Sequence, residues 1–379
     1  MEKITSKWIL LAAATLFAFA SCDDDRNSNP TLRTPATFVL NTPAYASGNV
    51  CDLETSTGVE LTCSPPDYGF AAATVYTVRV SLDGDFDTEG KSLTLPTTFS
   101  KAKLTVDATE LAVAQTTLAL SAGRTEADFP ITTPLTIRLR AALTNGMGET
   151  SSNPVTIERV RTVFALSPVV LPAAMYVAGS GIGNWDWNSA LAMVPTWDNL
   201  GTFWHIIYCA AGDEMKFNTV HAPDGSEFGT AATLVDNAEA GAGPGSDGSL
   251  RVTNAGWYLV VLRTAIEGRT LRYTVIFEQP YVYLIGATAR DGAWAIDAAN
   301  RFAIPATRDG RFVSPPFESA GEVRMCVSIE GEDWWHSEFI LSDDGHITYR
   351  GTGGDQERYT QAAGRRAHLD FMTGNGSYE

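Results

Sequence analysis

Hydrophobic and polar positions alternate along most of the chain after residue 36, in short runs separated by glycine, proline, asparagine or aspartate. Because successive side chains of a strand point to opposite faces, this alternation predicts half-buried β-strands. Helix-forming residues gather only at 108–115, and that stretch is short. The pattern therefore predicts an all-β protein. The expected strands are residues 37–40, 59–63, 75–81, 135–141 and 154–158, then 174–178, 202–208, 214–218, 256–262 and 271–277, and finally 281–285, 311–314 and 322–327.

An internal repeat organises the second half of the chain. The segment that ends at Trp187 recurs without a gap in the segment that ends at Trp294, 107 residues later. Lys216 and Arg324 also fall at matching places in the two copies. A repeat of this period indicates two tandem copies of one structural module, which we call the second and third modules.

The strands before the repeat are spaced like those of an immunoglobulin or fibronectin type III sandwich. Proline-containing residues 165–173 have the composition of a junction. We therefore expect an N-terminal sandwich, the first module, followed by two tandem β-sandwich modules. The predicted boundaries are 1–21 for a signal peptide, 22–33 for a tether, 34–168 for the N-terminal domain, and 172–278 and 280–379 for the repeated modules.

The N-terminus predicts export. Lys3 and Lys7 precede an apolar run at residues 8–20 that is too short to span a bilayer, and Ser21 then precedes Cys22. This order is typical of a lipoprotein signal, which makes Cys22 the lipid-attachment residue and anchors the mature chain to a membrane. The alternative is an ordinary cleaved signal followed by an incidental cysteine.

The formal net charge of −17 and the pI near 4.7 restrict the kinds of ligand that this protein is expected to bind. A field of this sign repels nucleic acid and anionic lipid surfaces, so neither is an expected ligand. The composition favours a neutral ligand.

Cysteine positions leave one question open. Val59, Leu61 and Cys63 alternate with polar residues, so Cys63 is expected on the inward face of a strand. If residues 51–63 form a hairpin that turns near Thr57, a disulfide between Cys51 and Cys63 is feasible, and only geometry decides it. The other two cysteines, Cys209 and Cys326, are expected to be buried free thiols. No spacing of cysteine and histidine residues suggests a zinc site.

Catalytic motifs are not found in the sequence. The five histidines form no His-Glu-x-x-His motif, and no serine lies in a Gly-x-Ser-x-Gly elbow. A glycosidase would need two carboxylates flanking a cleft, but scattered acids in an acidic protein mostly indicate a solvated surface. The turn at Asp83–Asp87 has carboxylates at alternate positions, and it reads as a capped turn in preference to a calcium site. The sequence predicts neither an enzyme nor a cofactor.

The remaining evidence for a binding site comes from the tryptophans. An indole held at the rim of a loop can take the apolar face of a sugar ring, while basic side chains and amides fix the sugar hydroxyls. The alternative is that these rings fill the core, as expected for Trp204 and Trp257. In the third module the candidate glycan-binding residues are Trp294, Arg324, Trp334, Trp335 and Arg350.

The second module offers Trp187 and Lys216, but the loop after Lys216 has no tryptophan. Its site therefore needs substitutes, for which Trp197, Asn218 or Trp185 are available. The Gly-rich stretch 237–248 is expected to be mobile and not to carry ligand.

Seven segments together resemble the SusE/SusF family of starch-utilisation-type outer-membrane lipoproteins. They are residues 35–48, 66–70, 81–86, 152–157, 183–188, 216–218 and 373–378. The acidic run 23–25 after Cys22 also resembles the tag that Bacteroidetes lipoproteins use to reach the outer face of the outer membrane.

This resemblance implies a non-catalytic α-glucan binder with a fibronectin-like spacer and two carbohydrate-binding modules, anchored on the cell surface beside a SusC/SusD-type transporter complex. It also implies that Trp294, Arg324, Trp334 and Arg350 bind glycan in the third module. Such proteins also occur with other glycans, so the ligand stays open, and a structural or adhesive surface lipoprotein without glycan sites is the rival interpretation.

Overall fold

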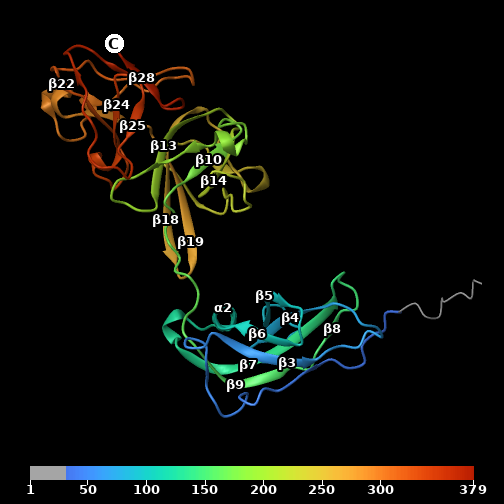
Figure 1. Cartoon of the computed structure of the whole chain (residues 1–379). Helices are drawn as coiled ribbons and strands as arrows, with labels where there is room; N and C mark the ends of the chain where they lie inside the picture. Colours follow the sequence, from blue (N-terminus) through green and yellow to red (C-terminus); the bar gives the residue numbers. More distant parts are fainter. Residues whose placement is uncertain (1–30) are drawn as a thin grey trace, which may run out of the picture. The chain divides into compact units, whose positions relative to one another are not determined.

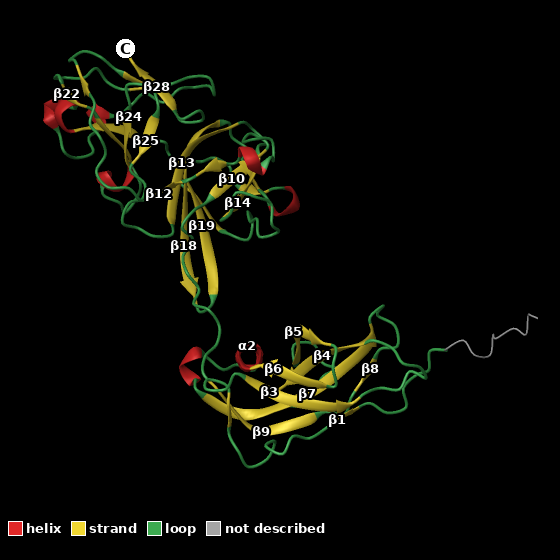
Figure 2. Ribbon diagram, viewed as in Figure 1, coloured by secondary structure: helices red, strands yellow, loops and turns green. Residues whose placement is uncertain are grey.

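The computed structural model describes residues 31–379, so the predicted signal peptide and Cys22 lie outside the described residues. The chain divides into two compact units, Met1–Ser167 and Pro168–Glu379. Strands are the main regular secondary structure of both units, and helices are few and short (Figures 1 and 2). The predicted all-β class is confirmed. No described helix is long and apolar enough to cross a membrane.

The first unit contains two sheets around one core. The smaller sheet has the order β1 (Val39–Leu40), β3 (Gly58–Ser64) and β6 (Lys103–Asp107). The larger has the order β2 (Cys51–Asp52), β9 (Val155–Thr162), β7 (Ile131–Leu143), β4 (Thr74–Ser81) and β5 (Ser92–Phe99), with β8 (Thr150–Ser151) beside β7. Side chains from both sheets, such as Leu61 and Ile137, form a single hydrophobic cluster. The predicted strands are present, but β2, β5, β6 and β8 were not predicted.

Helix α2 (Ala108–Ser121) is longer than the predicted 108–115 segment. It begins at Asp107, whose carboxylate accepts hydrogen bonds from the backbone N–H groups of Thr109 and Glu110. It continues because Leu118 joins the hydrophobic core of this unit. Tertiary packing thus extends a helix that the local pattern marked as short. A short 3₁₀ turn, η2 (Glu126–Asp128), follows.

The hairpin that would bring Cys51 opposite Cys63, which the sequence left open, does not form. Strand β2 pairs in parallel with β9, where Cys51 lies opposite Val160, whereas β3 belongs to the other sheet. Both cysteines are free thiols in this structure. The Asp83 turn is held by its own side chains, since the Asp83 carboxylate accepts bonds from Ser81 and Lys91. Its carboxylates therefore serve a capped turn.

The second module is a sandwich of two five-stranded sheets. One sheet has the order β11 (Leu191–Ala192), β10 (Tyr176–Gly179), β14 (Glu214–Asn218), β17 (Leu250–Arg251) and β16 (Gly243–Pro244). The other has the order β12 (Val194–Pro195), β13 (Thr202–Cys209), β18 (Gly256–Glu267), β19 (Thr270–Glu278) and β15 (Thr233–Asp236). Two 3₁₀ turns, η3 (Trp187–Ser189) and η4 (Ser246–Gly248), lie in its loops.

The third module has shorter strands. The largest sheet has the order β20 (Val282–Ile285), β23 (Arg324–Val327), β24 (Glu338–Leu341) and β25 (Ile347–Tyr349). A second sheet has the order β21 (Phe312–Val313), β27 (Ala367–Asp370) and β28 (Asn375–Tyr378). A third consists of β22 (Gly321–Glu322) and β26 (Thr360–Gln361). Its 3₁₀ turns are η5 (Gly286–Thr288), η6 (Arg290–Gly292), η7 (Ala298–Asn300) and η8 (Trp334–Ser337).

The sequence repeat is also a repeat of strand register. Strands β10 and β14 are antiparallel and place Ala178 opposite Lys216. Strands β20 and β23 are antiparallel and place Ile285 opposite Arg324. The two basic residues therefore occupy equivalent positions in the two modules, as their spacing predicted.

The second and third modules share a hydrophobic core. Strands β13 and β18 send one set of side chains, such as Phe203 and Val260, into the second module's own core. They send the alternate set, including Trp204 and Trp257, into a cluster with third-module residues such as Phe312. The Trp257 and Phe312 ring centroids are 5.2 Å apart. The two modules therefore form one packed body, and both tryptophans are buried as predicted.

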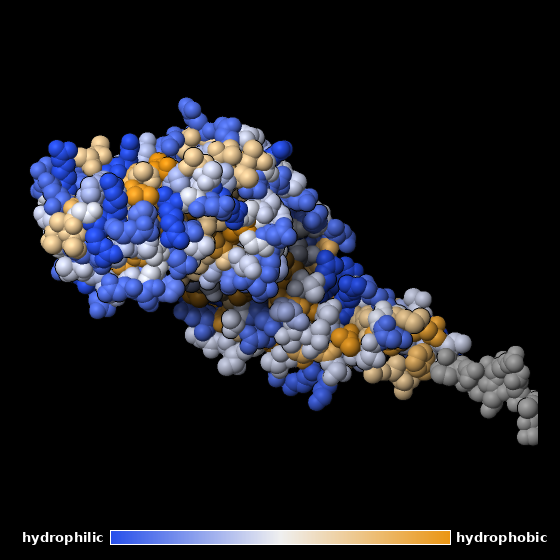
Figure 3. Space-filling view, turned by 90° about the horizontal axis from the view of Figure 1, so that it is seen from above, coloured by the Kyte–Doolittle hydropathy of each residue, from blue (hydrophilic) through white to orange (hydrophobic). Residues whose placement is uncertain are grey.

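Polar side chains cover most of the face drawn in Figure 3, and apolar side chains form only small groups on it. Large hydrophobic side chains that are exposed occur in all three modules, among them Val50, Leu200 and Trp294. Scattered exposure of this kind is ordinary for a protein surface. An exposed tryptophan on a turn, such as Trp294, is less common than an exposed aliphatic side chain.

Candidate functional site

Trp294 is the most exposed tryptophan of the described chain, at 57%. It follows the 3₁₀ turn η6, and its ring lies against the backbone of Gly286. A Cβ atom at Gly286 would lie 3.1 Å from the ring of Trp294, and Gly286 has a φ of +79°. Glycine at this position therefore allows the indole to approach the loop backbone closely, while more than half of the side chain stays exposed.

A second indole and a guanidinium complete a platform around Trp294. The ring centroids of Trp294 and Trp334 are 6.0 Å apart and their planes meet at 49°. The Arg324 Cζ atom lies 5.1 Å from the Trp294 ring centroid. The structure thus brings together three residues that the sequence predicted for one site: two apolar faces and a cationic donor.

A buried carboxylate holds Arg324 from below. Glu338 is fully buried, and its Oε1 atom lies 3.5 Å from Arg324 Nη1 and 3.3 Å from Arg358 Nη2. Its other oxygen, Oε2, accepts a 3.0 Å hydrogen bond from Arg350 Nη1. One carboxylate therefore orients three guanidinium groups, two of which the sequence singled out. Glu338 and Arg358 were not predicted, because nothing local marks a strand glutamate as an inward-facing anchor.

Arg350, Trp335 and Trp197 form a separate group. The Arg350 Cζ atom lies 5.0 Å from the Trp197 ring centroid and 5.2 Å from that of Trp335. Trp334 and Trp335 are adjacent in the 3₁₀ turn η8, and they face different neighbours. The structure therefore places Trp334 with Trp294, and Trp335 in the joint between the modules.

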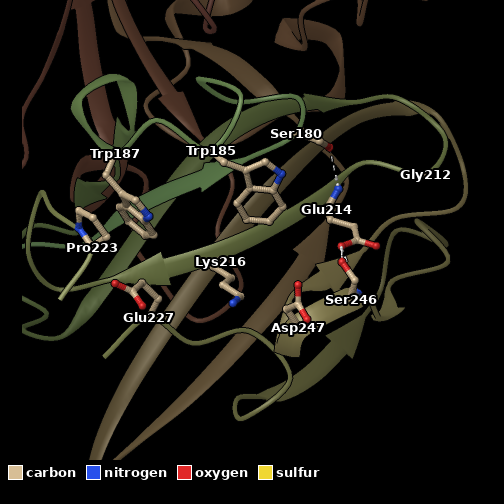
Figure 4. A pocket seen from close by; sticks show the side chains of 10 residues that line it. All are labelled: Ser180, Trp185, Trp187, Gly212, Glu214, Lys216, Pro223, Glu227, Ser246 and Asp247. Atoms are coloured by element: carbon tan, nitrogen blue, oxygen red, sulfur yellow. Dashed lines mark hydrogen bonds between the residues drawn. The ribbon is translucent and has the colours of Figure 1, made fainter. Parts of the chain in front are cut away.

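The second module has a hollow of about 530 Å³ on the corresponding loops, drawn in Figure 4. Trp185 and Trp187 form one wall, and the Lys216 side chain projects beneath their rings. Trp187 is 8% exposed and Trp185 is 38% exposed. Trp185 has a φ of +66°, a left-handed conformation that turns its side chain out of the loop. The remaining lining residues are Ser180, Gly212, Glu214, Pro223, Glu227, Ser246 and Asp247.

Lys216 supplies the positive charge of this hollow. No carboxylate of residues 31–379 lies within ion-pair distance of its ammonium group, although Glu227 and Asp247 line the same space. An unpaired ammonium at the wall of a hollow has three hydrogen-bond donors to offer to a ligand.

The Gly-rich stretch expected to be mobile is instead anchored at this hollow. The Glu214 carboxylate accepts hydrogen bonds from the hydroxyls of Ser246 and Ser249, and these bonds lower its pKa. Asp247 between them faces the hollow. The sequence missed this contribution because composition does not show which strand a loop packs against.

Two predicted residues of the second module lie elsewhere. Asn218 is buried, and its side chain is occupied by Ala222, Asp224 and Ser226 of its own loop. Trp197 lies under the Arg350 guanidinium and does not line the hollow. Trp185, which the sequence offered only as a substitute, lines the hollow instead.

Two family models match this chain. A family model described as SusF/SusE starch specific CBMs, that is, carbohydrate-binding modules, matches residues 174–274 and 281–377. A second model, described as SusE outer membrane protein, matches residues 24–140. The repeated matches fall on the second and third modules.

Outer membrane protein SusF of Bacteroides thetaiotaomicron is 38% identical to this chain over an alignment of 219 residues, and the match covers 55% of this chain and 44% of SusF. The chain thus matches less than half the length of that relative. A crystal structure of SusF from the same species covers 90% of this chain and 99% of that one, at 21% identity and a TM-score of 0.45. This likeness is too weak to carry an argument.

The family model alone spans more than half of the chain, and it describes modules that bind carbohydrate and are not catalytic. The chain therefore belongs to the SusF/SusE family of carbohydrate-binding modules.

Proposed function

We propose that the second and third modules each bind an α-glucan of the starch type by stacking sugar rings on tryptophan and donating hydrogen bonds from one basic residue. The third site consists of Trp294, Trp334 and Arg324. The second consists of Trp185, Trp187 and Lys216. The starch-specific description of the matching family supports this choice of ligand.

The observation that carries the proposal is the tilt between Trp294 and Trp334. Two indoles at 49° with centroids 6.0 Å apart make an angled surface. A flat glycan ribbon meets only one of two rings tilted in this way, whereas the curved chain of an α-glucan can lay successive sugar units on both. Stacking supplies apolar contact area, and the Arg324 guanidinium supplies hydrogen bonds to hydroxyls.

Two such sites on one body favour long glycans. The second and third modules share a core, so their sites keep a fixed separation. When one site holds a polysaccharide, the second binding event is intramolecular, and the overall affinity exceeds that of either site. The protein therefore holds polymer more tightly than short oligosaccharides.

Affinity electrophoresis in gels that contain amylopectin tests the proposal. The protein is expected to migrate more slowly than in an empty gel, and Trp294→Ala combined with Lys216→Ala should restore normal migration. A protein that is not retarded by amylopectin but is retarded by another polysaccharide would assign a different glycan. No retardation in any glycan would favour a structural or adhesive role.

The location follows from the sequence signals and the relatives. We infer that Cys22 carries lipid, that the chain is anchored in the outer membrane facing the exterior, and that it works beside a SusC/SusD-type transporter. The description of the N-terminal match as an outer membrane protein supports the membrane. Metabolic labelling with a fatty-acid analogue should mark the wild type and not Cys22→Ala, and protease added to intact cells should cleave the chain.

A further inference from the structure

We propose that Trp197 of the second module is a positioning residue for the glycan site of the third module. This inference rests on the proposed function, because it concerns the same third site. Trp197 lies in the loop between β12 and β13, outside the hollow of its own module. Its contacts run to the third module by two separate routes.

The first route ends at Arg324. The Trp197 ring lies under the Arg350 guanidinium, with Cζ 5.0 Å from the ring centroid. Arg350 donates a 3.0 Å hydrogen bond to Glu338, whose second oxygen lies 3.5 Å from Arg324 Nη1. Since Arg324 covers the Trp294 ring, the orientation of the donor on the platform depends on a chain of contacts that begins in the other module.

The second route ends at Trp334. The backbone N–H of Trp197 donates a 2.9 Å hydrogen bond to the carbonyl of His336. His336 belongs to the 3₁₀ turn η8, which also carries Trp334. The turn is therefore fixed at its far end to the second module.

A neighbour of Trp197 reinforces this route. The Asn199 side chain donates a hydrogen bond to the Glu332 carboxylate. The other oxygen of Glu332 lies 2.7 Å from Nδ1 of His336. One short loop of the second module thus holds both the segment before η8 and the turn itself.

The joint is rigid enough to act in this way. The two modules share one hydrophobic cluster, and Trp257 Nε1 donates a 3.0 Å hydrogen bond to the carbonyl of Thr307 across it. Arginine has several rotatable bonds, and fixing it before the ligand arrives removes an entropic cost from binding. A cation–π contact and a buried ion pair are suitable means of fixing it.

Calorimetric titration with maltoheptaose in two backgrounds tests the proposal. The first background, Trp185→Ala with Lys216→Ala, reports the third site alone. The second, Trp294→Ala, reports the second site alone. In the first background Trp197→Leu, which keeps apolar volume but removes the aromatic face, is expected to weaken binding by roughly tenfold. In the second background the same change should leave affinity within about twofold.

Conservative and neighbouring variants separate positioning from general stability. Trp197→Phe retains an aromatic face and should restore affinity to within about threefold of the parent. Leu200→Ala, in the same loop and 76% exposed, should change neither site. Should Trp197→Leu unfold, Asn199→Ala tests the same joint, and it is expected to weaken the third site alone.

Three outcomes would overturn the positioning role. They are an unchanged third site in a folded Trp197→Leu variant, equal losses at both sites, and a Trp197→Phe variant as weak as Trp197→Leu. A parent protein that binds no maltoheptaose or other glycan in either background would instead refute the proposed function. Failure of the inference and failure of the function are therefore distinguishable.

Discussion

Lys216 and Arg324 occupy the same register position in two copies of one module, but their side chains are held differently. Arg324 is tied to the buried carboxylate of Glu338, whereas no carboxylate in the described part of the chain pairs with Lys216. The third site therefore has an oriented donor and the second has a flexible one. A rigid planar donor favours one ligand geometry, and a flexible ammonium group tolerates several. We expect the third site to discriminate more sharply between glycans.

Replacing Trp294 by alanine should abolish most binding at the third site without loss of stability. The ring is 57% exposed, so its removal leaves no cavity in the core. Loss of one stacked ring is expected to weaken maltoheptaose binding about tenfold or more. Titration and thermal unfolding of the same sample check both statements. A fall of the unfolding midpoint by several degrees would show that the ring is structural.

Replacing Lys216 by alanine should weaken the second site and spare the fold. Its ammonium group has no ion-pair partner among residues 31–379, so nothing in the folded chain loses a counter-charge. A hydrogen bond from a charged donor contributes about 1.5–3 kcal/mol, which corresponds to a loss of roughly tenfold or more. Titration in the Trp294→Ala background measures the affinity of the second site, and Lys101→Ala is the control. Unaltered affinity would remove Lys216 from the site.

Replacing Glu338 by glutamine should destabilise the second unit strongly. The carboxylate is fully buried and is contacted by Arg324, Arg350 and Arg358. Removing one partner of a buried ion pair typically costs about 3–5 kcal/mol, because the remaining charges lose their compensation. Urea unfolding measures the free energy of unfolding of Glu338→Gln and of Glu322→Gln, a control at an exposed position in the same module. Equal stability of the two variants would contradict a stabilising role of the contacts between Glu338 and the three arginines.

His205 should make stability depend on pH. Burial lowers the pKa of His205 to about 4 in the folded chain, compared with an ordinary value near 6.5. Between these values the unfolded chain binds the proton and the folded chain does not, so stability falls as pH decreases from about 6.5 toward 4. The loss is on the order of 3 kcal/mol at the lower end.

The measurement for His205 is the urea midpoint at pH 7 and pH 5. The wild type and His221→Gln, which changes an exposed histidine, should lose stability alike on acidification. A folded His205→Gln variant should lose less, because it has no group to protonate at that position. Parallel losses in all three proteins would assign the pH dependence to other groups.

Thiol labelling should follow burial. Burial raises the pKa of Cys209 to about 12 and also raises that of Cys326, so neither is a thiolate at neutral pH. Cys51 is only half-buried and should react first with iodoacetamide. After denaturation without reductant, Cys51 and Cys63 should both be labelled, as mass spectrometry can show. Protection of this pair until reductant is added would reveal a disulfide.

Much of the fold could be predicted from periodicity. The near-continuous apolar runs at 202–208 and 256–262 marked two central strands, because a strand that is buried on both faces carries hydrophobic side chains at almost every position. The short strands β24 and β25 of the third module were missed, since they show few alternations and, unlike β20 and β23, have no counterpart among the strands predicted for the second module. Helix α2 was cut short, because its last turns depend on core contacts that the local sequence does not display.

The sequence by itself determined the repeat, the all-β class and the matching places of Lys216 and Arg324, because each depends on spacing along the chain. Only the tertiary structure decided which tryptophans share a surface. Trp334 lies beside Trp294, while its neighbour Trp335 contacts Arg350 in the joint between the modules. Such contacts join loops far apart in sequence, and they are fixed by how two sheets pack and which charges they bury. No pattern within one segment records that information.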